Sequence, residues 1–335
     1  MKKVFPFLFV LFLINASVCA EAKEAIAYTH LTNDYWQIWV MDSDGNNKRQ
    51  VTTSPQDKRD PTWVIDLSST KDNIKEVNTA FSLGEKGRYT GFHNVFGKEK
   101  ASNGGEKIAF RTNNSQLFTV DLDGRNEEEI LKKYGVITNP NFSKAANEIV
   151  FVRFDPRGKD ISDIWKSDLK GENSKLLTKD KLGKFQPRFS PYGDKIAFVK
   201  ADPDKLNYHI WIMNSDGSDP RQLTEGKGFD THPSFSFDQK QITFSSNRNE
   251  NNFEIYSITF GGDNFGISSK KIKQLTHFSG LDTQSNFSVD GKKIVFVSNR
   301  SGNQQIWSMN SDGSDPAPLT IEAGESMDPA WGDVE

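Results

Sequence analysis

The feature of the sequence that most constrains its fold is a set of short motifs that recurs six times along the 335 residues. An apolar segment ending in an aromatic residue has copies at 25–28, 107–110, 148–151, 195–198, 241–244 and 293–296. An aliphatic–aromatic pair follows each copy, at 38–39, 117–118, 164–165, 210–211, 255–256 and 306–307. Both segments alternate with a period of two, which indicates strands, and the second runs into a glycine-containing turn. Repeats of about 40 to 50 residues with several short strands are typical of propeller blades.

Two further segments complete each repeat. One is a short strand ending at 51–52, 130–131, 177–178, 223–224, 275–276 and 319–320. The other opens with a polar residue, usually followed by proline and then an aromatic, at 60–63, 139–142, 186–189, 232–235, 284–287 and 328–331. The last copy has no repeat after it and the first repeat has no copy before it, so we expect the two to pair and leave no exposed sheet edge. The sequence therefore predicts an all-β fold over residues 21–335: a six-bladed β-propeller of four-stranded antiparallel blades, closed by the C-terminal strand pairing into the N-terminal blade.

The blade motif resembles that of the TolB-like β-propeller family, with its PD40/WD40-like repeat. The segments at 189–198 and 287–296 carry the resemblance, together with 245–248 and 298–300. The resemblance covers essentially the whole mature chain, but it implies fold more than function, because related blades occur in prolyl-peptidase enzymes and pectin-degrading lyases. TolB itself carries an α/β domain before its propeller, and we expect this chain to lack that domain.

The first twenty residues have the layout of a secretory signal peptide. Lys2 and Lys3 precede an apolar run at 4–14, and small residues lead to Ala20. The run is too short to span a bilayer and no longer one follows, so we expect a periplasmic or secreted protein without a transmembrane segment. Cys19 is the only cysteine. Because bacterial lipoproteins are cut just before a cysteine that becomes lipidated, lipid anchoring at Cys19 is the alternative to cleavage after Ala20.

Charge and motif content exclude several function classes. The formal net charge of −3 gives no basic surface of the kind that nucleic acid requires. The sequence has no Gly-x-Ser-x-Gly elbow, no HExxH and no paired metal ligands. We therefore expect a monomer with no catalytic residues, no metal site and no cofactor, and leave a cation in the central channel open.

The polar residues that open the fourth segments are the leading candidates for a site. Sixfold repetition would bring them to one end of the channel, where they could receive a partner's loop, bind a hydrated cation or hold water. We call these residues the ring: Asp60, Asn139, Gln186, His232, Gln284 and Asp328. Asp230 and Asp282, two residues ahead of His232 and Gln284, are expected to add negative charge at this mouth. Arg248 and Arg300 are expected to form salt bridges between blades.

The second blade carries a long insertion at about 66–104. Insertions on a rigid scaffold often carry function, although a surface loop also tolerates lengthening at little entropic cost. If the insertion forms a lid over the channel, its aromatic and basic residues are the candidates: Arg88, Tyr89, Phe92, His93 and Phe96.

These observations lead to one main hypothesis of function and one alternative. The main hypothesis is an exported, non-catalytic propeller that binds a protein partner of the cell envelope through its channel mouth. The resemblance implies a lipoprotein or a translocating polypeptide as that partner. The alternative is a propeller-fold lyase or hydrolase acting on a polysaccharide or peptide, although an acidic rim would repel polyanionic substrates.

Overall fold

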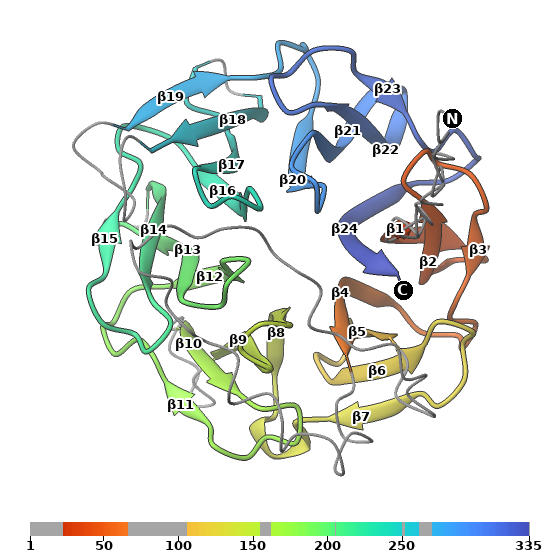
Figure 1. Ribbon diagram of the computed structural model, residues 1–335, viewed down its shortest axis with the longest axis horizontal. Helices are drawn as coiled ribbons and strands as arrows, with labels where there is room; N and C mark the ends of the chain where they lie inside the picture. Colours follow the sequence, from red (N-terminus) through yellow and green to blue (C-terminus); the bar gives the residue numbers. More distant parts are fainter. Residues whose placement is uncertain are drawn as a thin grey trace, which may run out of the picture.

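The computed structural model of the protein describes residues 23–65, 106–154, 162–204, 206–249, 252–260 and 270–334. Its strands form six four-stranded antiparallel sheets that lie as blades around a common axis (Figure 1). This arrangement confirms the predicted six-bladed propeller. The predictions for residues 1–20, Cys19 and the insertion at 66–104 fall outside the described residues.

The strands follow the chain around the ring, each blade running from the axis outward (Figure 1). Blade one contains β24 (Ser326–Val334), β1 (Lys23–Thr32), β2 (Tyr35–Asp42) and β3 (Arg49–Gln50). Blade two contains β4 (Lys58–Ile65), β5 (Glu106–Thr112), β6 (Leu117–Asp121) and β7 (Glu128–Ile130). A short 3-10 helix (Lys132–Tyr134) leads into blade three, with β8 (Ile137–Ser143), β9 (Glu148–Phe154), β10 (Ser162–Ser167) and β11 (Lys175–Leu176).

The remaining three blades repeat the same order. Blade four contains β12 (Lys184–Phe189), β13 (Lys195–Ala201), β14 (Tyr208–Asn214) and β15 (Arg221–Gln222). Blade five contains β16 (Asp230–Phe235), β17 (Gln241–Ser246), β18 (Glu254–Thr259) and β19 (Lys271–Gln274). Blade six contains β20 (Asp282–Phe287), β21 (Lys293–Ser301), β22 (Asn303–Asn310) and β23 (Ala317–Pro318).

The ring closes as the sequence predicts, because β24 from the end of the chain pairs with β1. The two strands run antiparallel, with Ile26 opposite Trp331. The indole Nε1 of Trp331 donates a hydrogen bond to Glu24 Oε2 at 2.7 Å. Pairing the two ends removes the sheet edges that an open ring would expose.

The hydrophobic core lies between neighbouring blades. Each of its six clusters combines buried residues from two adjacent sheets, and the cluster that joins blades six and one contains Ile26, Tyr28, Val297 and Trp331. The aromatic residues that end the first repeated segment contribute to every cluster, and all are buried: Tyr28, Phe110, Phe151, Phe198, Phe244 and Phe296. Burial of apolar area between the twisted sheets of neighbouring blades therefore holds the blades together and fixes the geometry of their inner strands.

Candidate functional site

The six ring residues line one cavity at the axis of the propeller. The cavity has a volume of about 40 Å³ and lies among the inner strands β4, β8, β12, β16, β20 and β24, which are nearest the centre in Figure 1. Each ring residue is mostly buried but keeps part of its surface accessible. The other lining residues come from the same strands: Pro61, Arg188, Pro233, Ser285, Asn286 and Pro329.

A repeated backbone irregularity sets the position of the ring. Every ring residue has a left-handed conformation, with φ between 49° and 55°. The pairing register of every inner strand shifts across the ring residue and the one after it. Such a bulge re-aims a side chain, and it tolerates the proline that follows five of the six ring residues because no ladder hydrogen bond is needed there. The polar–proline dipeptide is thus the sequence signal of this bulge.

Ring side chains bind the backbone of the next blade. Gln186 Oε1 accepts a hydrogen bond from the amide of His232 at 2.8 Å, and Gln284 Oε1 accepts one from Asp328 at 2.8 Å. Asn139 Oδ1 accepts from the Gln186 amide at 3.4 Å. The ring therefore ties neighbouring blades together, in addition to lining the cavity.

The ring histidine, His232, is neutral, and both of its imidazole nitrogens have hydrogen-bond partners. Because Gln186 Oε1 accepts the His232 amide, its Nε2 faces the imidazole and donates to His232 Nε2 at 2.8 Å. The proton of His232 then sits on Nδ1, which lies 3.1 Å from Thr231 Oγ1. Burial, reinforced by the positive charge of Arg188, lowers the pKa of His232 to about 4, against the opposing effect of Asp328. At neutral pH the imidazole therefore accepts at Nε2 and carries its proton at Nδ1.

The two ring carboxylates, those of Asp60 and Asp328, each form an ion pair with an arginine. Asp328 Oδ2 accepts from Arg59 Nε at 2.7 Å, and Asp60 Oδ2 accepts from Arg111 Nε at 3.0 Å. The Arg59 guanidinium also stacks 4.5 Å from the ring centre of Trp36. Burial alone would raise the pKa of Asp328, but the charge and hydrogen bond of Arg59 lower it overall. Both carboxylates are therefore neutralised by partners that belong to the protein.

Asp230 and Asp282 do not line the cavity, which corrects the expectation that they add negative charge at its mouth. Both are buried at the start of β16 and β20. Asp230 Oδ2 accepts from Arg248 Nη2 at 2.7 Å, and Asp282 pairs in the same way with Arg300. Each arginine lies in the same blade as its partner, so the expected salt bridges exist but are not between blades. A sequence cannot show this pairing, because it depends on the strand register that places the charges side by side.

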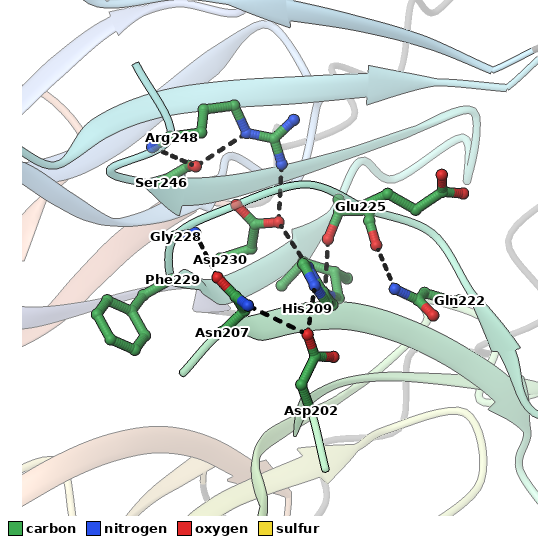
Figure 2. A network of polar contacts seen from close by, with 12 residues as sticks. Asp202, Asn207, His209, Gln222, Glu225, Gly228, Phe229, Asp230, Ser246 and Arg248 are labelled. Atoms are coloured by element: carbon green, nitrogen blue, oxygen red, sulfur yellow. Dashed lines mark hydrogen bonds and ion pairs between the residues drawn. The ribbon is translucent and has the colours of Figure 1, made fainter. Parts of the chain in front are cut away.

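A buried histidine extends the Asp230 network. His209 lies between Asp230, 3.5 Å from Nδ1, and Asp202, 3.3 Å from Nε2 (Figure 2). The contact with Asp230 is the largest of the effects that raise the pKa of His209. The same contact and that of Arg248 lower the pKa of Asp230, although burial opposes them. The network fixes the strand ends around Asn207 and Gly228, which Figure 2 shows beside it.

Comparison with known proteins agrees with this architecture. A family model described as the TolB β-propeller domain matches residues 105–266. The crystal structure of TolB from Acinetobacter baumannii superposes with a TM-score of 0.65 and 18% identity, over 92% of this protein and 66% of that one. Residues 105–266 thus match the TolB β-propeller domain family, and the propeller as a whole is TolB-like in fold. At this level of identity the structural likeness concerns the fold.

Sequence relatives of this TolB-like propeller match shorter segments. An uncharacterised protein of Agrobacterium fabrum is 33% identical over 114 residues, which are 34% of this chain and 36% of that protein. The Tol-Pal system protein TolB of Bordetella pertussis is 37% identical over 62 residues, or 18% of this chain and 13% of that protein. The matched segments thus span about a third or less of each relative.

The described part of the TolB-like propeller holds neither a metal-binding cluster nor a membrane-spanning helix. Among the residues with described positions, no three histidine, cysteine, aspartate or glutamate side chains gather in a way that could hold a metal ion. No helix in the same ranges is long and apolar enough to cross a membrane. The candidate lid residues lie outside the described residues, so the lid stays a prediction: Arg88, Tyr89, Phe92, His93 and Phe96.

Sequence reasoning missed the one charged residue that lines the cavity outside the ring. Arg188 lies two positions after Gln186 on β12 and lines the cavity with the ring. A comparison of the six repeats could have found it, because the equivalent position is uncharged in the other five blades: Thr62, Asn141, Ser234, Asn286 and Ala330.

Proposed function

We propose that this TolB-like propeller binds a protein partner by receiving the tip of a loop, or the end of a polypeptide, at the ring-lined cavity. The observation that carries the proposal is a polar cavity of about 40 Å³ on the propeller axis. Pockets that enclose small-molecule ligands measure about 300–1,000 Å³. A cavity of this size suits one or two side-chain tips of a macromolecule whose remaining contacts lie on the surrounding face.

The state of the ring favours binding over the enzymatic alternative. A general base needs a free lone pair and a pKa near the working pH. The Nε2 lone pair of His232 already accepts from Gln186, and its pKa is lowered to about 4. The carboxylates of Asp60 and Asp328 are held in ion pairs with arginines. These hydrogen bonds and ion pairs hold the ring side chains in defined positions, and a preorganised binding site requires such positioning.

The partner class and location of the proposed activity rest on the family resemblance and on the signal-like sequence at 1–20. We infer export to the periplasm or the exterior, and a partner in the cell envelope, either a lipoprotein or a translocating polypeptide. Lipid anchoring at Cys19 remains the alternative for its attachment, and metabolic labelling with a fatty acid, with Cys19→Ala as the control, distinguishes the two.

Co-purification tests the binding proposal. Tagged wild-type protein recovered from native envelope extract is compared with Asp60→Asn/His232→Asn/Asp328→Asn, after both are shown to be folded at the working temperature. The control removes carboxylates from exposed hairpin turns instead: Asp44→Asn, Asp123→Asn and Asp312→Asn. We expect the ring variant to lose most of a partner that wild type and control both retain. Equal recovery by all three proteins would refute the role of the cavity.

A further inference from the structure

Arg188 departs from the structural role that its position has in four of the other five blades. The residue two places after the ring usually accepts a hydrogen bond from the next blade: Asn141 Oδ1 from the Phe189 amide at 2.8 Å, and Asn286 Oδ1 from the Trp331 amide at 3.0 Å. Thr62 and Ser234 make longer versions of the same contact. A guanidinium has no acceptor atom, so Arg188 cannot do this. Blade one also lacks this hydrogen bond, because its residue is Ala330, but only blade four has a charged side chain at this position, and that side chain lines the cavity.

The guanidinium of Arg188 has few partners. Among the described residues its one hydrogen bond runs from Nη1 to the Pro140 carbonyl at 3.4 Å, and no carboxylate lies at ion-pair distance. Most of its five N–H donors are therefore left for water or a ligand. Burial lowers the pKa of Arg188 in spite of the opposing charges of Asp60 and Asp328, which is the sign of a cation without a close counterion.

The net charge of the cavity is positive. Asp60 and Asp328 are each matched by one arginine, and His232 is neutral at pH 7. Arg188 is the charge that remains. Because the cavity is half-enclosed, an ionic contact there is screened less than one on the open surface.

We propose that Arg188 is the receptor for a carboxylate of the protein partner, carried either by an aspartate or glutamate side chain or by the C-terminus of the partner. This inference rests on the proposed function and names the chemistry that the cavity recognises. A planar guanidinium offers two parallel N–H groups that match the two oxygens of a carboxylate, and such charge-assisted pairs are the stronger class of hydrogen bond. A carboxylate on a narrow peptide stem fits the cavity volume better than a uronic acid, whose carboxylate is attached to a sugar ring.

The resonance of the Arg188 Nε–Hε group measures this contact directly. The protein is labelled with ¹⁵N, the signal is assigned by its loss in Arg188→Gln, and short probes are titrated at constant ionic strength. The probes are acetyl-Gly-Glu-Gly-amide, acetyl-Gly-Gly-Gly with a free carboxylate, acetyl-Gly-Gln-Gly-amide and a monomeric hexuronic acid. Arg125→Gln is the matched control, because Arg125 is an exposed arginine that pairs with Asp123 on an outer turn.

We expect a carboxylate peptide to shift the Arg188 signal saturably and the glutamine peptide to leave it in place. The peptide that acts identifies a side chain or a terminal carboxylate as the source. Binding measured by calorimetry should weaken at least tenfold in Arg188→Gln, less in Arg188→Lys, and not in Arg125→Gln. An unmoved signal with both carboxylate peptides, an equal shift with the glutamine peptide, or a shift with the uronic acid alone would each overturn the proposal.

The two proposals fail in different ways. Loss of partner recovery in the ring variant, combined with no response of Arg188 to either carboxylate peptide, overturns the role of Arg188 and leaves partner binding standing. Full recovery by the ring variant overturns partner binding at the cavity, whatever the peptides do.

Discussion

Asp328 joins three separate segments of the protein at the cavity. Its carboxylate accepts hydrogen bonds from Arg59 Nε at 2.7 Å, Thr29 Oγ1 at 3.1 Å and Gln284 Nε2 at 2.8 Å. These contacts stabilise the ionised form, so the pKa of Asp328 is lower in the folded protein than in the unfolded state. Its contribution to stability is therefore present above the unfolded pKa of about 3.9 and is lost as the pH falls toward the folded value.

The change Asp328→Asn should reveal this dependence. At pH 7 we expect a loss of about 1–3 kcal/mol in the free energy of unfolding, because the half-buried Arg59 is left without its counterion. The gap between wild type and variant should shrink as the pH falls below about 4, because the unfolded wild-type chain protonates Asp328 there while the folded protein does so only at its lower pKa. Urea denaturation at pH 7 and pH 3 measures both values. A gap of equal size at the two pH values would contradict the assigned cause.

At the scale of the strands and turns, close packing between blades requires glycine at particular places. Gly313, in the turn between β22 and β23, has a φ of +95°, and a β-carbon there would lie 2.6 Å from the Leu275 carbonyl oxygen of blade five. Gly291, in the turn between β20 and β21 of the same blade, has a φ of +71° but no atom of the described residues within 4 Å. Both turns thus have a left-handed glycine, but only Gly313 lies against a neighbouring blade.

Replacement of each glycine by alanine separates these effects. Gly291→Ala should cost about 1–2 kcal/mol of unfolding free energy, the usual penalty of a β-carbon in the left-handed region. Gly313→Ala should cost about 1–3 kcal/mol more, because the turn must also move away from blade five. Thermal or chemical denaturation of both variants gives the difference. Equal losses would mean that the turn does not press against its neighbour.

At the scale of the whole molecule, stability depends on closure of the ring. Each blade packs on two others, and blade one is complete only when β24 pairs with β1. Loss of β24 would expose an edge of β1 and uncover the apolar surface around Ile26 and Tyr28 that Trp331 now covers.

Deletion of residues 326–335 should therefore abolish cooperative unfolding and promote aggregation. The comparison is Trp331→Phe, which keeps the strand and most of the buried aromatic area and should melt close to the wild type. Calorimetry and size-exclusion chromatography report the two properties. Cooperative melting of the deleted protein at the wild-type temperature would show that ring closure is dispensable.

The repeats alone are enough to predict the fold, the order of the strands, the closure of the ring and the six positions that face the cavity. Each of these depends on local alternation repeated six times, and symmetry turns a repeated residue into a ring. The left-handed conformation of the ring residues is different, since glutamine, which stands at two of the six positions, rarely adopts it without tertiary contacts.

The availability of each charge, by contrast, depends on the three-dimensional arrangement. Asp230 and Asp282 look like rim carboxylates in the sequence, yet strand register pairs them with Arg248 and Arg300 inside their own blades. Arg188 looks like a variable residue, yet it lies in the cavity without a carboxylate partner among the described residues. A charge is open to a ligand only if no opposite charge lies within a few ångströms of it, and the groups that decide this come from segments far apart in the sequence.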